Sequence, residues 1–351
     1  MRNKIIYFLS GIVLATGAIS ANAQSSVASV PQGMINFSLI HNTTTYLSLP
    51  LTKNSSYTGS VAEVTTNTIS VDDVPGPFTT NLSSAAAPYF IRFLSGNETG
   101  RVLLITGNTV STLTLDTTDN GTGEAVALTT TSFDVEAGDT FEIFPGDTLA
   151  SVFGAGTPQH PLRLTGGSNV IASDTVTFYT SVTTPQVTYF FNTSADYWEQ
   201  YGTTANANNT IIYPFSSLSI TRRTAHPDMN LVLGGRVTPV SVLTKVIGRG
   251  TVYDSTHYPI DVTLSQLQFG ANWTMGTDVL SADTISVWNA ALGQFDTYYE
   301  EPDTTWRKYP DAVTDQSNFT ITAGNITTIA KRAAVSGASS FIKSTLPYSL
   351  N

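Results

Sequence analysis

The sequence predicts an all-β protein built from tandem β-sandwich or β-barrel-like domains, with an internally duplicated hairpin unit and only minor helix. Strand-like segments recur about every ten residues and are separated by turn-forming residues. Threonine, a β-branched residue suited to a pleated and half-exposed surface, is the most frequent residue. Aromatic residues make up 10% and hydrophobic residues 41% of the chain, enough to build a packed core.

The elements follow from alternating patterns and turns. Residues 102–106 and 112–115 read as strands, with a turn expected at Asp119-Asn120-Gly121 because Asn-Gly tolerates positive φ. Residues 139–145 form a further expected strand. Short helical turns are expected at 148–153 and 264–267. In the second half, residues 283–288 and 294–300 are predicted to form a hairpin whose faces alternate.

The second half contains a repeat. One copy begins at Asp174-Thr175, reaches Trp198 and ends at Arg222-Arg223, and the other begins at Asp283-Thr284, reaches Trp306 and ends at Lys331-Arg332. The three landmarks keep spacings of 109, 108 and 109 residues. This agreement predicts two homologous β units, at about 165–225 and 274–333. Residues 139–144 resemble the start of a third copy.

The domain organisation is predicted from a cluster of small and turn-forming residues at 154–158. It suggests an N-terminal β domain over 24–155 and a C-terminal β domain over 156–351 that contains both repeats.

The N-terminus has the layout of a secretory signal peptide over residues 1–23. Arg2 and Lys4 precede an uncharged apolar run, and Ala21-Asn22-Ala23 predicts cleavage before Gln24. The alternative is an uncleaved N-terminal anchor. No transmembrane segment is expected after cleavage, so the predicted location is extracytoplasmic: secreted, at the cell surface or in the periplasm.

Charge and cysteine content restrict the partners. The net charge is −10 and becomes −12 once Arg2 and Lys4 are removed, so nucleic acid and anionic membranes are not expected partners. The chain has no cysteine, which excludes disulfides, thiolate chemistry and a lipid anchor at the cleavage site.

No catalytic, cofactor or metal site is predicted. The four histidines, His41, His160, His226 and His257, are scattered without metal-ligand spacing. The acidic loop 116–124 is the best calcium candidate, although a hairpin turn explains the same residues. Glu300-Glu301, beside Tyr298 and Trp306, is the first place to look for a glycosidase pair.

Two residue groups are the candidate interaction sites. The first is an aromatic set that either packs the hairpin cores or offers flat platforms for a sugar: Tyr197, Trp198, Tyr298, Tyr299 and Trp306. The second is a set of cations at the ends of strands, expected to protect an exposed sheet edge or to meet the acidic surface of a neighbouring subunit: Arg222, Arg223, Lys331 and Arg332.

Several motifs together resemble a known family. They are Leu47-Ser48-Leu49-Pro50, Phe78-Thr79-Thr80, Pro88-Tyr89-Phe90 with Ser95-Gly96, Gly138-Asp139-Thr140-Phe141, the segment 148–154, and the two tryptophan units with their basic pairs. On these the chain resembles an uncharacterised family of exported, β-rich proteins from Verrucomicrobia and related bacteria. Glu300-Glu301 and Lys331 depart from the family pattern. The resemblance implies export but brings no activity, substrate or catalytic residue.

These observations favour a non-enzymatic structural protein of the cell surface or extracellular matrix, such as a filament or surface-assembly subunit. Self-assembly is the expected partner interaction, and the segment 24–40 is expected to add as a strand to a neighbouring copy. The alternative is a carbohydrate-binding or adhesive module that uses its tyrosines and tryptophans to hold a surface glycan.

Overall fold

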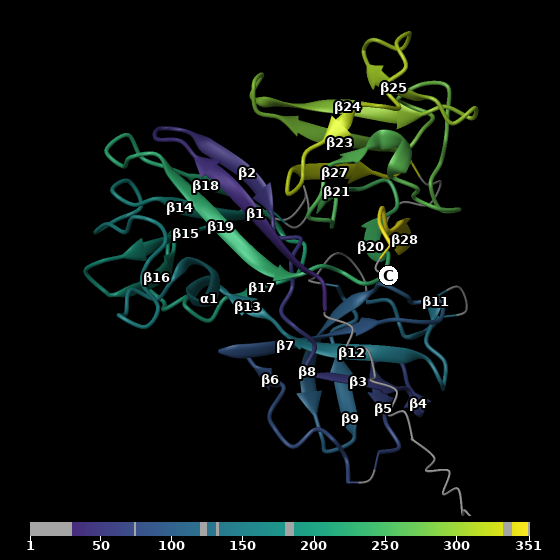
Figure 1. Cartoon of the computed structure of the whole chain (residues 1–351), viewed down its shortest axis with the longest axis horizontal. Coiled ribbons are helices and arrows are strands. Elements are labelled where there is room, and N and C mark those ends of the chain that lie inside the picture. The colour runs from purple at the N-terminus through teal and green to yellow at the C-terminus, as the bar shows by residue number, and fades with distance from the viewer. Residues whose placement is uncertain are drawn as a thin grey trace, which may run out of the picture. The chain divides into compact units, whose positions relative to one another are not determined.

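Antiparallel β structure accounts for nearly all the regular elements, which confirms the predicted all-β class with only minor helix (Figure 1). The computed structural model describes residues 30–73, 75–119, 125–130, 133–179, 186–332 and 339–349. The predicted signal peptide lies outside the described residues. Within the described ranges, no helix has the length and apolar character needed to cross a membrane.

The largest sheet belongs to the first half of the chain and has eight strands. Its order is β3-β12-β7-β8-β9-β5-β4, with β6 paired to β7. The expected strands at 102–106 and 112–115 are β8 and β9, and 139–145 contains β12. The strands are β3 (Tyr57–Ser60), β4 (Glu63–Val64), β5 (Thr68–Ser70), β6 (Ser83–Ser84), β7 (Ala87–Phe93), β8 (Val102–Asn108), β9 (Thr112–Leu115) and β12 (Thr140–Pro145).

Two five-stranded sheets contain the two predicted repeats and have the same strand order. The first sheet runs β16-β15-β14-β18-β2 and the second runs β25-β24-β23-β27-β21. The first comprises β2 (Thr44–Ser48), β14 (Thr175–Tyr179), β15 (Val187–Asn192), β16 (Tyr197–Gln200) and β18 (Ser217–Thr221). The second comprises β21 (Thr251–Ser255), β23 (Thr284–Asn289), β24 (Gln294–Glu300), β25 (Trp306–Tyr309) and β27 (Ile326–Ala330). The hairpin expected over 283–300 is the β23–β24 pair.

The remaining strands form two-stranded ribbons. They are β1 (Gln32–Leu39) with β19 (Met229–Arg236), β20 (Val242–Ile247) with β28 (Ser339–Ser344), β13 (Asp147–Thr148) with β17 (Ile211–Ile212), β22 (Val262–Thr263) with β26 (Thr320–Ile321), and β10 (Thr129–Thr130) with β11 (Phe133–Asp134). The two expected helical turns are present as α1 (Leu149–Phe153) and a 3-10 helix at Leu264–Gln266. Thr148 caps α1 by accepting a hydrogen bond from the Ser151 N–H.

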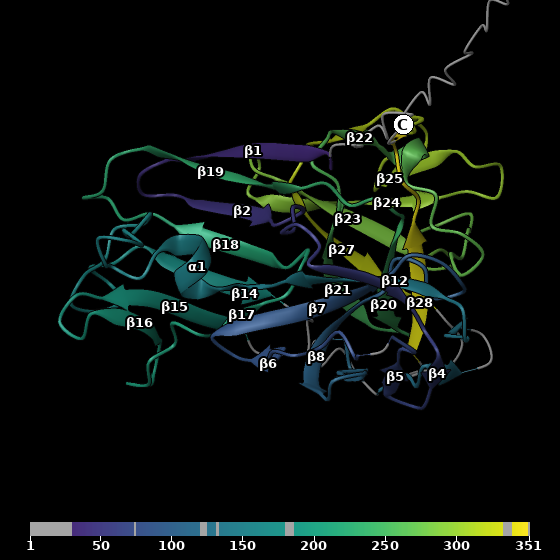
Figure 2. The same cartoon turned by 60° about the horizontal axis from the view of Figure 1, so that its bottom comes forward.

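Strands from the start of the chain join the second half. β2 pairs with β18, and β1 pairs with β19 along all eight residues. Figure 2 shows the β1–β19 ribbon lying over the sheet that contains β2 and β18. Ile35 and Phe37 of β1 share one hydrophobic core with Leu47 and Trp198 of that sheet. Residues on both sides of position 155 therefore pair in the same sheets, and residues 31–351 form one compact unit.

Candidate functional site

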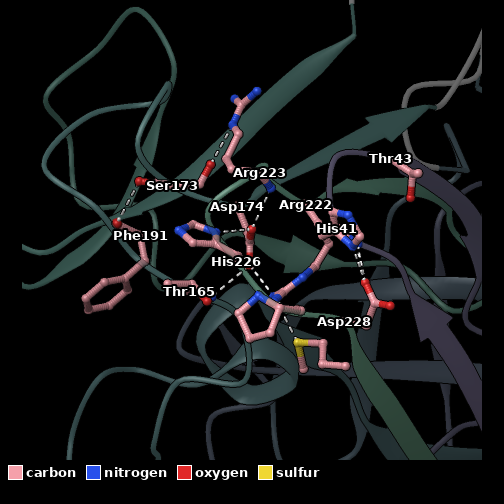
Figure 3. A network of polar contacts seen from close by, with 12 residues as sticks. His41, Thr43, Thr165, Ser173, Asp174, Phe191, Arg222, Arg223, His226 and Asp228 are labelled. Atoms are coloured by element: carbon pink, nitrogen blue, oxygen red, sulfur yellow. Dashed lines mark hydrogen bonds and ion pairs between the residues drawn. The ribbon is translucent and has the colours of Figure 1, made fainter.

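A buried aspartate, Asp174, is the centre of the polar network in Figure 3. Its Oδ2 accepts hydrogen bonds from the Arg222 guanidinium at 2.5 Å and from the Thr165 N–H at 2.9 Å. Its Oδ1 accepts from the Arg223 N–H at 3.2 Å and contacts Nδ1 of His226 at 2.6 Å. Both carboxylate oxygens thus have two nitrogen partners each, which offsets the cost of burying the charge.

The topology explains how residues 48 positions apart meet. Asp174 immediately precedes β14, and Arg222 immediately follows β18. The two strands are antiparallel, with Thr175 opposite Thr221, so the start of one lies beside the end of the other. The expected Asp-Thr landmark and the expected basic pair are therefore one cluster, which we call the Asp174 clamp and define by Asp174, Thr165, Arg222, Arg223 and His226.

The second sheet has an equivalent cluster around Asp283. Its Oδ2 accepts from the Lys331 ammonium at 2.6 Å and from the Thr274 N–H at 2.7 Å, and its Oδ1 accepts from the Arg332 N–H at 2.6 Å. Lys331 also donates to the Asn272 carbonyl. We call these residues the Asp283 clamp. Each of its members except Asn272 lies 109 positions after its counterpart in the Asp174 clamp.

Other contacts recur at the same spacing. In each sheet a hydroxyl pair links the two strands of the hairpin, and a glycine N–H bonds a carbonyl of the hairpin's second strand. The pairs are Thr177 with Thr188 and Ser286 with Thr297, both at 2.9 Å, and Gly167 N–H to Phe191 O at 3.1 Å with Gly276 N–H to Glu300 O at 3.0 Å.

The placement of the basic pairs differs from the expected exposed sheet edge. Arg222 and Lys331 are only 2% and 5% exposed, and each is ion-paired within its own sheet. Arg223 is half-buried and donates to the Ser173 and Val170 carbonyls, whereas the Arg332 side chain is exposed. The edge interpretation was wrong for Arg222 and Lys331 because it considered only the end of one strand and not the aspartate that the neighbouring strand brings beside it.

The aromatic set lies mainly inside the two cores. Trp198, Trp306, Tyr298 and Tyr299 are buried, and Tyr197 is half-buried with its hydroxyl donating to the Thr204 carbonyl. The Trp198 indole N–H donates to the Gly154 carbonyl at 2.7 Å, and its ring contacts Phe153 and Phe191. A sugar platform needs an open ring face. The two indoles therefore occupy the position of hairpin-core residues.

A small cavity of about 130 Å³ has the Asp254–His257 pair in its lining. His257 is buried, and its Nε2 contacts both Asp254 Oδ1 at 2.7 Å and Thr244 Oγ1 at 3.1 Å. A serine-protease-like relay requires the acid and the nucleophile on opposite ring nitrogens. Here both share one nitrogen, so the geometry does not fit that relay.

The calcium candidate loop is partly described. Asp116 accepts hydrogen bonds from Thr118 and from the Tyr213 hydroxyl, and Asp119 accepts two from Arg101 at 3.1 and 2.8 Å. The Arg101 guanidinium thus already neutralises Asp119. Residues 120–124 lie outside the described residues. Among those described, no group of three or more His, Asp or Glu side chains is arranged to hold a metal ion.

Arg101 also binds a second buried carboxyl. Glu98 Oε1 accepts from Arg101 at 3.2 Å, and Glu98 Oε2 is buried without a hydrogen-bond partner among the residues described. Burial raises the pKa of Glu98 from 4.5 to about 7, against the opposing effect of the Arg101 cation. Sequence patterns did not single out Glu98, because Glu98-Thr99-Gly100-Arg101 reads as an ordinary turn.

The other candidates are isolated. His41 forms an exposed pair with Asp228 at 2.7 Å, and His160 is exposed on the loop after α1. Glu301 is ion-paired with Arg307 at 2.8 Å, and burial raises the pKa of Glu300. Comparison of the chain with protein-family models, curated proteins and solved structures finds no match. The resemblance to exported β-rich proteins stays a prediction.

Proposed function

We propose that the protein is an exported, non-enzymatic structural protein of the cell surface or extracellular matrix, and that copies assemble through the open edge of β1. The predicted signal peptide and the resemblance to exported β-rich proteins support the location. The observation that carries the assembly is the pairing of β1, which among the described residues has a partner strand, β19, on one side and none on the other.

The hydrogen-bond pattern shows which backbone groups of β1 point outward. Arg236, at the end of β19, exchanges both its backbone hydrogen bonds with Thr52, and so directs them away from β1. Gln32 of β1 lies opposite Arg236. Along an antiparallel pair, the backbone N–H and C=O groups of successive residues point alternately toward the partner strand and away from it. Met34, Asn36 and Ser38 therefore direct their N–H and C=O groups away from β19, and they make no backbone hydrogen bond with another described residue.

The composition of this edge favours pairing with another chain. β1 reads Gln-Gly-Met-Ile-Asn-Phe-Ser-Leu, with no charge, proline or bulge. Charges, prolines and bulges are the usual devices that stop an edge strand from pairing. Met34 is 73% exposed and adds apolar area beside the free backbone groups. The expected strand addition by the segment 24–40 thus takes a specific form: Gln32–Leu39 pairs with β19 in its own chain and offers its second edge to a second copy.

The buried ionic clusters support a structural role. In both clamps the carboxylate and its cation are used for hydrogen bonds that join the start of one strand to the end of its neighbour. We also infer that the two five-stranded sheets arose by duplication. The common strand order and the recurrence of clamp contacts 109 residues apart support this inference.

Proline at Asn36 tests the assembly. Because the Asn36 N–H points away from β19, Asn36→Pro removes an outward donor without removing a ladder hydrogen bond. Asn36→Ala keeps the donor and is the matched control. We expect purified mature protein and Asn36→Ala to sediment as oligomers and to form visible assemblies in negative-stain micrographs, and Asn36→Pro to be a folded monomer. A wild-type protein that stays monomeric, or an Asn36→Pro variant that assembles like the control, refutes the proposal.

One observation favours the carbohydrate-binding alternative. Tyr201 and Tyr309 lie 108 residues apart, at the ends of the equivalent edge strands β16 and β25, and are 64% and 56% exposed. An open phenol ring suits stacking on a sugar face, and each sheet offers one. Glycan-array binding that is lost in Tyr201→Ala and Tyr309→Ala but kept in Trp306→Phe would support this function, and no binding by the wild type would exclude it on the glycans tested.

A further inference from the structure

A cavity of about 490 Å³ lies between the β1–β19 ribbon, helix α1 and the segment 49–54. This volume is within the range of small-molecule sites. Its inner wall is apolar and comes from four separate segments. The apolar lining residues are Ile35, Phe37, Leu49, Leu51, Val152 and Leu233.

Two glycines fix one wall of this cavity. Gly33 and Gly235 lie opposite each other in the ribbon, on the face that carries Ile35 and Leu233. A Cβ atom on Gly235 would lie 2.7 Å from the Thr52 carbonyl oxygen, a distance that real side chains do not reach. The glycine pair therefore allows the segment at Thr52 to bond the end of β19, where Thr52 and Arg236 exchange backbone hydrogen bonds.

The polar rim of the cavity has an excess of positive charge. It contains Lys53, Arg163 and Arg236, and the one acid in the lining is Asp147. Lys53 is paired with Asp147 at 2.8 Å, and Arg236 is paired with Glu142. Arg163 is exposed, donates to the Val232 carbonyl at 3.1 Å and pairs with no carboxylate of the described residues. In a chain of net charge −10 this local cation attracts an anionic group.

Unsatisfied donors on the same side agree with this polarity. Arg236 Nε and Thr52 Oγ1 are buried and have no hydrogen-bond partner in the part of the chain that the structure describes. Buried polar groups normally have hydrogen-bond partners. These two groups can donate to an acceptor on a bound ligand after a small side-chain rotation.

We infer that this cavity binds a small amphipathic anion, a single alkyl chain that carries a carboxylate or a phosphate. The chain packs on Phe37, Leu233 and Val152, and the head group binds the Arg163 guanidinium, which forms bidentate hydrogen bonds with either anion. The site is independent of the outward edge of β1, because it uses the inner face of that strand.

Calorimetric titration tests the inference with four probes that share a ten-carbon chain and differ in the head group. Each probe is used below its critical micelle concentration. Decanoate and decyl phosphate carry the two anionic heads, decyl maltoside carries a neutral head and decyltrimethylammonium a cationic one. We expect saturable binding of the anionic probes that exceeds binding of the neutral and cationic ones. Tighter binding of decanoate indicates a fatty acid as the natural ligand, and tighter binding of decyl phosphate indicates a lipid head group.

Four variants separate binding of the head group from binding of the alkyl chain. Arg163→Gln is expected to weaken both anionic probes about tenfold and to leave the neutral probe unchanged. Arg332→Gln, at an exposed arginine of the second sheet, is the charge-matched control and should bind as the wild type does. Leu233→Trp fills the cavity and should abolish binding of every probe, and Val152→Phe does the same from α1 if the first variant does not fold.

The opposite results overturn the inference. They are no saturable binding by the wild type, equal binding of anionic and cationic probes, the same affinity in Arg163→Gln and Arg332→Gln, or full binding by a folded cavity-filling variant.

Discussion

The Asp174 and Asp283 clamps both pair a buried aspartate with a cation from the neighbouring strand, but the cations differ. In both, a carboxylate at the start of one strand accepts hydrogen bonds from a backbone N–H nine residues earlier and from a cation at the end of the neighbouring strand. The first clamp uses an arginine and adds His226, and the second uses a lysine. The common element is thus a pair of opposite charges that joins the start of one strand to the end of its neighbour, and arginine or lysine can supply the cation.

The difference also shows what each cation must reach. Arg222 uses two nitrogens, of which one contacts Asp174 and Met229 Sδ and the other donates to the Pro227 carbonyl. Lys331 uses one nitrogen for both Asp283 and a carbonyl. The two guanidinium nitrogens of Arg222 thus reach acceptors on different sides of the group, whereas the single ammonium of Lys331 serves two acceptors that lie together.

Removal of the aspartate has the largest expected effect. Asp174→Ala and Asp283→Ala each leave a buried cation without its partner, which costs about 3–5 kcal/mol of the free energy of unfolding. We expect the larger loss at Asp174, where His226 also loses its partner. Urea denaturation of both variants measures the two values.

A double variant distinguishes ion pairing from a general packing defect. In Asp174→Ala/Arg222→Met the uncompensated cation is gone, so the double variant should recover a large part of the stability lost in Asp174→Ala. A double variant no more stable than the single one would contradict the role given to the clamp.

Another buried carboxyl, Glu98, differs from the two clamp aspartates because only one of its oxygens has a donor among the described residues. Because burial raises the pKa of Glu98 from 4.5 to about 7, the folded protein keeps a proton on Glu98 between these pH values, where the unfolded chain has lost it. The free energy of unfolding therefore falls as pH rises from about 4.5 to about 7, by up to about 3 kcal/mol from this group.

Glu98→Gln should remove this part of the pH dependence. The amide keeps an oxygen for Arg101 but does not titrate. Denaturation at pH 5 and pH 8 should thus show a smaller loss of stability in Glu98→Gln than in the wild type, and the exposed control Glu63→Gln should follow the wild type. Equal pH dependence in all three proteins would show that Glu98 titrates normally.

The local sequence pattern predicted the positions of the strands better than it predicted which strands pair with each other. The β23–β24 hairpin and helix α1 follow from alternation, turn residues and caps within a few positions. The Asp174 clamp depends on the pairing of β14 with β18, whose strands are separated by a hairpin and loops. Although both halves of the clamp were visible as landmarks, no local rule brings them together.

The cavity was still less accessible to sequence reasoning. Its wall combines β1, the segment 49–54, α1 and β19. The sequence of each segment, taken alone, has only an ordinary strand, loop or helix pattern and does not indicate a cavity. Its glycine pair becomes meaningful only once the register places Gly33 opposite Gly235.

Trp198 and Trp306, the tryptophans of the two hairpin units, extend the comparison of the sheets with smaller expected effects. Both rings are buried, but only the Trp198 indole makes a hydrogen bond with a described residue, the Gly154 carbonyl. Trp306→Phe loses packing volume alone, about 1–2 kcal/mol, whereas Trp198→Phe also leaves a buried carbonyl unpaired and should cost about 1 kcal/mol more. Thermal unfolding of both variants gives the difference, and equal costs would show that the hydrogen bond contributes nothing.

The smallest expected effect is the exchange of the cation itself. Arg222→Lys keeps the charge next to Asp174 but cannot also reach the Pro227 carbonyl, which costs about 1 kcal/mol. The cost stays small because arginine already carries a buried Nε without a partner, and lysine removes that unsatisfied donor.

Arg222→Met, which has a similar length and no charge, is the control and should cost several times more, because it leaves Asp174 buried without its ion pair. Urea denaturation of both variants checks the order. If Arg222→Lys were as destabilising as Arg222→Met, the hydrogen-bond geometry of the guanidinium, rather than its charge, would stabilise the Asp174 clamp. The two clamps would then depend on different interactions.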